Sequence, residues 1–120
     1  MTTQARTTED KMKQALVITP EGEMSKIDIA TDALEKLQGA VYGWVQAVDL
    51  DSEFTMWCNE EGKMIGLERN PYAQYMWDKV FGAGTDVIVG TVVITGGTDN
   101  DGETIGLTDD QVSLLALRNI

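Results

Sequence analysis

Four polar side chains in one short segment have the chemistry to hold an anionic molecule. Lys63 and Arg69 carry positive charges, and the amides of Asn59 and Asn70 both donate and accept hydrogen bonds. Asn70 stands before Pro71, a pair typical of a helix start, and a helix N-terminus favours anions. The segment therefore predicts a site for a small anionic or nucleotide-like ligand, provided that the turn and the helix start converge on one pocket.

Two aromatic residues stand on either side of this segment. Trp57 and Tyr72 offer rings on which the base of a nucleotide could stack. In a small domain such rings more commonly fill the core, so both roles stay open at this point. A protein with such a site could sequester a signal molecule.

A second group of candidate side chains is acidic. The chain has 20 Asp and Glu residues against 9 Lys and Arg residues, which gives a formal charge of -11. Five acids near the C-terminus form the predicted acidic patch: Asp99, Asp101, Glu103, Asp109 and Asp110. We expect this patch to bind a basic protein surface, with plain solubility as the alternative. We expect no direct contact with nucleic acid, because that draws on clustered Lys and Arg.

Other residue patterns argue against catalysis and against a metal. The chain has no histidine, which removes Ser-His-Asp and Cys-His nucleophile systems and histidine zinc ligands. Asp49, Asp51 and Glu53 alternate on one predicted strand face, where solvent exposure is the simpler account. The acids of residues 98–103 do not fit the register of a calcium loop, and the glycines form no phosphate-binding motif. We therefore expect a non-catalytic protein without metal or cofactor.

Compartment signals are few and agree with one another. Cys58 is the single cysteine, so the chain cannot form an internal disulfide. The longest apolar run, residues 87–94, is far shorter than the ~20 residues of a membrane span. The polar start of the chain has no apolar stretch of signal-peptide length. We expect a cytoplasmic protein that does not enter a membrane.

The elements that would position these side chains predict one small α+β domain. At 120 residues the chain fits a single core, here residues 14–120, after a flexible tail over residues 1–13. Strands are predicted at residues 15–19, 24–29, 42–50, 53–58, 64–67 and 86–95, in a mostly antiparallel or mixed sheet. About three short helices are predicted, over residues 31–38, from residue 70 to the glycines at 82–84, and from residue 108.

Helix ends are predicted from local spacing. Asp32 with Glu35, and Thr108 with Gln111, stand at the spacing of a capping box. Gly39 is predicted to end the first helix.

Two further glycines and one strand carry specific expectations. Gly62 is predicted to supply the positive φ of the turn between strands 53–58 and 64–67. Gly90 is predicted to allow a bulge or a close backbone approach. Strand 42–50 has apolar residues on both faces, which predicts a strand covered on both sides.

Two stretches of the chain resemble a known family. Residues 58–70, CNEEGKMIGLERN, and residues 86–94, DVIVGTVVI, are similar to the Domain of Unknown Function 3846 family, small proteins carried largely by phages, plasmids and their hosts. The matching positions are Asn59, Glu60, Glu61, Gly62, Lys63, Gly66, Asn70, Asp86 and Gly90. In the family the last Asn is usually followed by Arg, whereas here Arg69 precedes Asn70 and Pro71 follows it.

The resemblance brings no established activity, but it implies a setting. A protein of a phage or mobile element is expected to be an accessory binding protein that modulates a host protein or blunts a host defence. With the acidic patch, this implies a host protein with a basic surface as partner. The alternative is the small-ligand site described first.

Overall fold

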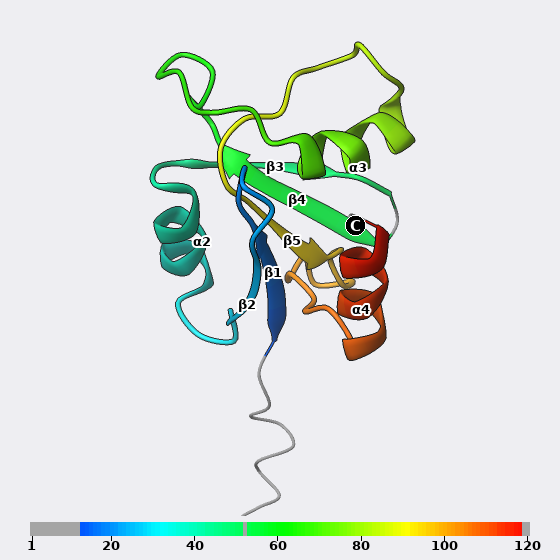
Figure 1. Ribbon diagram of the computed structural model, residues 1–120. Helices are drawn as coiled ribbons and strands as arrows, with labels where there is room; N and C mark the ends of the chain where they lie inside the picture. The colour runs from blue at the N-terminus through cyan, green and yellow to red at the C-terminus, as the bar shows by residue number, and fades with distance from the viewer. Residues whose placement is uncertain (1–12, 52, 119–120) are drawn as a thin grey trace, which may run out of the picture.

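The computed structural model describes residues 13–51 and 53–118 (Figure 1). The predicted tail over residues 1–13 lies outside the described residues except at its last position. The described elements follow in the order β1 (Gln14–Ile18), β2 (Met24–Asp28), α2 (Ala33–Val41), β3 (Val45–Asp49), β4 (Phe54–Asn59), α3 (Pro71–Phe81), β5 (Val92–Gly96) and α4 (Asp109–Arg118).

The five strands form one sheet in the order β2-β1-β5-β4-β3, and every neighbouring pair is antiparallel. The central strand β5 is buried along its whole length, as expected for a Val- and Ile-rich strand with neighbours on both sides. With three described helices packed on this sheet, the predicted α+β class is confirmed. None of the helices in the described part of the chain has the length and apolar character needed to cross a bilayer.

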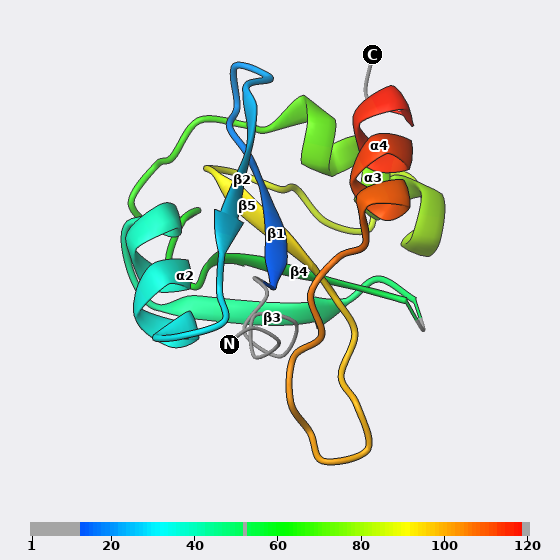
Figure 2. The same cartoon turned by 90° about the horizontal axis from the view of Figure 1, so that it is seen from below.

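Helices cover both faces of the sheet. Figures 1 and 2 show α2 on one face, with α3 and α4 together on the other. Successive side chains of β1 point to opposite faces of the sheet. Leu16 and Ile18 pack into the core beneath α3 and α4, whereas Ala15 and Val17 pack into the core beneath α2. The domain therefore has two apolar layers separated by the sheet.

Three strand predictions are wrong, each in a different respect. The strand predicted at 86–95 begins only at Val92, because Gly90 adopts a φ of 77° and redirects the chain. Residues 64–67 form no strand, and residues 64–66 lie in turns. Strand β3 is not covered on both faces, since Gln46, Ala47 and Asp49 are exposed; Trp44, just before it, is 69% exposed.

The first helix also departs from its predicted ends. Asp32 lies in the left-handed region with a φ of 53°, and its side chain makes no capping hydrogen bond. The predicted capping box with Glu35 is therefore wrong. Gly39 lies inside α2, which ends with Tyr42 in the left-handed region, at a φ of 66°.

The other two helix starts are confirmed. Thr108 and Gln111 form a reciprocal capping box, in which the Gln111 N–H donates to Thr108 Oγ1 at 3.1 Å and the Thr108 N–H donates to Gln111 Oε1 at 2.9 Å. Asn70 caps α3 by accepting the Ala73 N–H at 3.0 Å, with Pro71 at the first helical position.

Candidate functional site

The turn after β4 is anchored by one asparagine. Asn59 Nδ2 donates to the carbonyl of Val41 at 3.0 Å, and its Oδ1 accepts the Glu61 N–H at 2.8 Å. The Gly62 N–H donates to the Asn59 carbonyl at 3.1 Å. Asn59 therefore ties the turn to the end of α2, and its side chain is occupied by protein partners.

Close packing holds this turn against the segment that precedes β5. A Cβ added at Gly62 would lie 2.9 Å from Val89 Cγ2, and one added at Gly90 would lie 2.7 Å from Leu67 Cδ1. The predicted positive φ at Gly62 is wrong, since the residue of this turn with positive φ is Gly66. A side chain at Gly62 would collide with Val89. A side chain at Gly90 would collide with Leu67, and the positive φ of Gly90 also favours glycine. The predicted close approach at Gly90 is confirmed.

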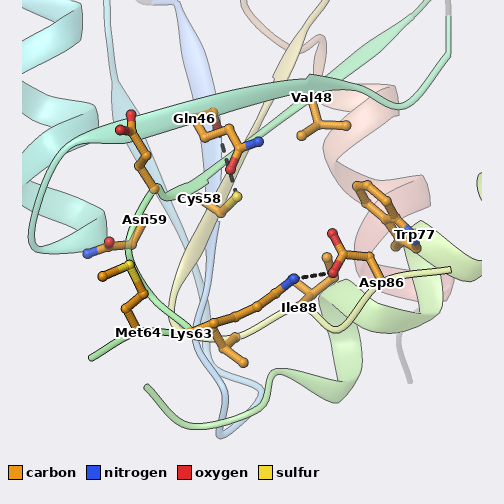
Figure 3. A pocket seen from close by; sticks show the side chains of 11 residues that line it. Gln46, Val48, Cys58, Asn59, Lys63, Met64, Trp77, Asp86 and Ile88 are labelled. Carbon is orange, nitrogen blue, oxygen red and sulfur yellow. Dashed lines mark hydrogen bonds and ion pairs between the residues drawn. The ribbon is translucent and has the colours of Figure 1, made fainter. Parts of the chain in front are cut away.

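An ion pair joins the turn to the same segment. Lys63 Nζ donates to Asp86 Oδ1, and this oxygen also accepts the Val87 N–H at 2.8 Å (Figure 3). The hydrogen bond from Lys63 lowers the pKa of Asp86 below its usual value. Because the two side chains are 57% and 38% exposed, the pair contributes no more than ~1 kcal/mol to stability.

This ion pair stands at a pocket of about 260 Å³ between the turn, strands β3 and β4, and α3. Figure 3 shows Gln46 and Val48 reaching in from β3, and Trp77 from α3. Its lining residues are Gln46, Val48, Cys58, Asn59, Glu60, Lys63, Met64, Trp77, Asp86, Ile88 and Val89. The lining combines apolar walls with a few charged groups, which is the usual composition of a small-molecule site.

Cys58 presents its thiol to this pocket. Its Sγ lies 3.8 Å from the carbonyl oxygen of Gln46. Burial raises the pKa of the thiol, and the negative charge of Asp86 raises it further, while Lys63 acts in the opposite sense. A protonated thiol is a poor nucleophile at neutral pH, so the pocket gains a polar contact here and no reactive group.

Two residues of α3 shape the pocket although neither was among the predicted ligand-binding residues. Gln74 Oε1 accepts the Ile88 N–H at 2.8 Å, and its Nε2 donates to the carbonyl of Asp86 at 2.8 Å. Trp77 Nε1 donates to Thr85 Oγ1 at 2.8 Å, which fixes the ring that lines the pocket. No local signal marks Gln74, because its partners are backbone groups on a segment that only the folded chain brings near.

The structure brings together few of the predicted ligand-binding residues. Lys63 and Asn59 line the pocket. Asn70 is fully buried elsewhere, where its Nδ2 donates to the carbonyls of Ile18 at 3.0 Å and Gly90 at 2.9 Å. Its side chain is a brace between segments and does not face the pocket.

The other three predicted contacts lie outside the pocket. Trp57 packs into the core beneath α2 and donates from Nε1 to Thr95 Oγ1 at 2.9 Å. Tyr72 packs against the core beneath α3 and α4, with its ring over Gly22. Arg69 is exposed, and its backbone bridges Val89. Trp77, from the same face as the pocket, takes the place foreseen for Trp57.

The predicted acidic patch is divided into two groups. Figure 2 shows the loop between β5 and α4, which carries Asp99, Asp101 and Glu103, reaching away from the start of α4. Asp99 Oδ1 accepts the backbone N–H groups of Asp101 and Glu103, both at 2.9 Å. Asp109 lies in the first turn of α4 with Asp110 and accepts a hydrogen bond from Gln14 Nε2 at 2.9 Å.

Two of the alternating acids, Asp49 and Asp51, also have structural partners. Asp51 Oδ1 accepts the N–H groups of Glu53 at 2.7 Å and Phe54 at 3.0 Å, which closes the turn between β3 and β4. Asp49 accepts a hydrogen bond from Thr55 Oγ1 at 3.2 Å. Across residues 13–51 and 53–118, no cluster of three or more acids or cysteines has the geometry to hold a metal ion.

Comparison with known proteins identifies the family. Neither the curated proteins nor the solved structures give a match. The family model "Domain of unknown function (DUF3846)" matches residues 12–119. That range includes the turn, the ion pair and every residue that lines the pocket. The resemblance noted in the sequence is therefore confirmed, and the chain belongs to the DUF3846 family.

Proposed function

We propose that this protein is a non-catalytic binding protein whose pocket takes a small, nucleotide-like anionic ligand. The observation that carries this proposal is the Lys63–Asp86 ion pair at a partly apolar pocket. Lys63 is the cation among the lining residues, and its bond to a half-exposed carboxylate is weak. An anionic group on a ligand can therefore compete with Asp86 for Lys63, and the other contacts of the pocket must outweigh its repulsion from the carboxylates of Asp86 and Glu60.

The remaining lining narrows the chemistry of the ligand. Trp77, Met64 and Ile88 offer apolar surface for a flat ring. Glu60 and the released Asp86 add two carboxylates, which accept hydrogen bonds from donors on the ligand. A molecule with an anionic group, a flat ring and an exocyclic amine satisfies all three parts. Sequestration of such a signal in a host defence is the role we propose for it.

Thermal unfolding against a panel of nucleotides and cyclic nucleotides tests this function. A ligand at about 100 times its dissociation constant adds about 2.7 kcal/mol to stability, a rise of several degrees in Tm for a domain of this size. We expect one class of nucleotide to raise the Tm. Lys63→Ala abolishes the rise, whereas Arg69→Ala, which removes an exposed cation outside the pocket, preserves it. A flat panel, or equal loss in both variants, contradicts the proposal.

A second candidate function rests on the loop between β5 and α4. We propose as its partner a host protein with a basic surface, as an accessory protein of a phage or mobile element would need. The loop projects from the domain, and Asp99, Asp101 and Glu103 are all exposed on it. Exposed charges of one sign speed encounter with an oppositely charged partner.

The second candidate is tested by capture of proteins from bacterial lysate at increasing salt. Asp101→Asn with Glu103→Gln removes two charges and keeps Asp99, which braces the loop. Captured protein is expected to decline with salt and with these substitutions. Capture that is indifferent to both would rule out an acidic docking surface.

A further inference from the structure

The outer side of β3 presents unpaired backbone groups. The Leu50 N–H donates to the Phe54 carbonyl, and the Glu60 N–H donates to the Trp44 carbonyl. Because antiparallel strands bond to a partner at every second residue, the even-numbered residues of β3 face β4. The N–H and C=O groups of the odd-numbered residues, Val45, Ala47 and Asp49, therefore point away from the sheet. Among the described strands, none lies on that side (Figure 2).

The two edges of the sheet differ in how they are protected. On β2, the opposite edge, Lys26 is exposed at the middle of the strand, and Lys36 Nζ donates to the carbonyl of Asp28 at 2.8 Å. Charged Lys side chains at an edge oppose the addition of another strand. Strand β3 has the small, exposed Ala47 at its middle, and it pairs with β4 through five consecutive residues without a bulge. Its edge is thus open to strand addition.

We propose that the outer edge of β3 is a docking site for an extended peptide segment with basic side chains, which adds to the sheet as a sixth strand. Charge selects this occupant. No Lys or Arg occurs between Lys36 and Lys63. The hairpin of β3 and β4 and the turn after it carry five acids in that interval: Asp49, Asp51, Glu53, Glu60 and Glu61. A second copy of this chain would bring the same acids together and is disfavoured.

The side chains beside this edge add selectivity. Gln46 and Val48 project on the face that holds the pocket, and Trp44, two residues earlier, continues their row with 69% of its surface exposed. A Lys or Arg of the added strand would lie over the Trp44 ring in a cation–π contact. The outward backbone groups that would bond the added strand belong to Val45, Ala47 and Asp49, none of which lines the pocket, so strand addition does not require occupancy of the pocket.

The test uses the full chain labelled with 15N and a short synthetic peptide that alternates Lys and Val. A matched peptide with Glu in place of Lys is the charge control. We expect the basic peptide to slow hydrogen exchange at the amides of Val45, Ala47 and Asp49, while the amides of Gln46 and Val48, already bonded to β4, change little. Equal binding of both peptides, or protection on β2 instead, overturns the proposal.

Edge variants complete the experiment. Ala47→Pro removes an outward N–H and is expected to weaken peptide binding by about tenfold, the loss of one to two hydrogen bonds. Ala47→Lys keeps the fold, because that side chain is exposed, and weakens binding by like-charge repulsion. Lys26→Pro makes the matched change on β2 and leaves the affinity unchanged. Unaltered affinity in both Ala47 variants, or a dimer through β3 without peptide, overturns the proposal. Neither Ala47 variant alters nucleotide stabilisation at the pocket, so the two proposals fail independently.

Discussion

Asn70 shows how a single side chain can hold three parts of the chain together. Its amide donates to backbone carbonyls of Ile18 and Gly90, and its oxygen accepts the Ala73 N–H. The residue is fully buried, so water cannot replace any partner that is lost. The same amide chemistry that suggests ligand binding in the sequence is used here for the fold.

Replacing Asn70 with Ala is therefore expected to destabilise the protein by about 3 kcal/mol, roughly one for each lost hydrogen bond. Urea unfolding measures the change. Asn100→Ala, in the exposed loop between β5 and α4, is the control and should stay within about 0.5 kcal/mol of the parent. A loss below 1 kcal/mol for Asn70→Ala would show that these hydrogen bonds are not the brace described.

The charges around Cys58 make a second prediction at the residue scale. Asp86 raises the pKa of this thiol and Lys63 lowers it, after the larger effect of burial. Asp86→Asn should lower the pKa of the thiol, because a negative charge is removed while Lys63 remains. At a fixed pH below that pKa, the thiolate fraction rises and iodoacetamide should alkylate Cys58 several-fold faster. Lys63→Met should slow the reaction, and Asp101→Asn should not change it. Equal rates in all three variants would mean that Cys58 does not sense the ion pair.

At the scale of elements, the segment before β5 decides where the pocket forms. Residues 86–95 are rich in Val and Ile, which predicts one long strand. Gly90 bends the segment. The backbone N–H of Asn70 then donates to the carbonyl of Ile88, and the backbone N–H of Gly90 donates to the carbonyl of Glu68. The strand of the sheet begins after the bend, and Asp86 is left beside Lys63.

Gly90→Ala therefore tests both the bend and its packing. We expect a loss of about 1–3 kcal/mol, because φ is 77° and the new Cβ would meet Leu67. Gly102→Ala is a matched control, since Gly102 has a φ of 80° but nothing within 4 Å of an added Cβ. It should show the backbone cost alone. Equal losses in the two variants, measured by urea unfolding, would mean that the Leu67 contact does not matter.

Local patterns predict the elements better than they predict the site. The capping box at Thr108 and the cap at Asn70 are short-range signals, and both are confirmed. Other local signals fail, as with the capping box predicted at Asp32 and Glu35. The failures at the pocket involve long-range contacts. Trp57 and Trp77 look alike in the sequence, and only the face of β4 and the packing of α3 place Trp77 at the pocket and Trp57 in the other core.

At the scale of the whole molecule, the sheet separates the surfaces that we assign to binding. The pocket lies on the face covered by α3 and α4, the open edge of β3 lies beside it, and the acidic loop projects from the far end of β5 (Figure 2). The chain has a formal net charge of -11, and Lys63 is the positively charged residue that lines the pocket. A small anion must therefore be recognised at short range, by contacts in the pocket and not by the field of the molecule.

An NMR titration of the 15N-labelled chain with the nucleotide that raises Tm most tests this account most directly, because it reports where the ligand binds. The account predicts shifts in the backbone amides of residues 60–64 and 86–89, which Lys63→Ala removes. Shifts at the start of α3 around Asn70 would instead support the site predicted from the sequence. Such shifts, or no shifts at saturating nucleotide, would contradict the pocket as the binding site.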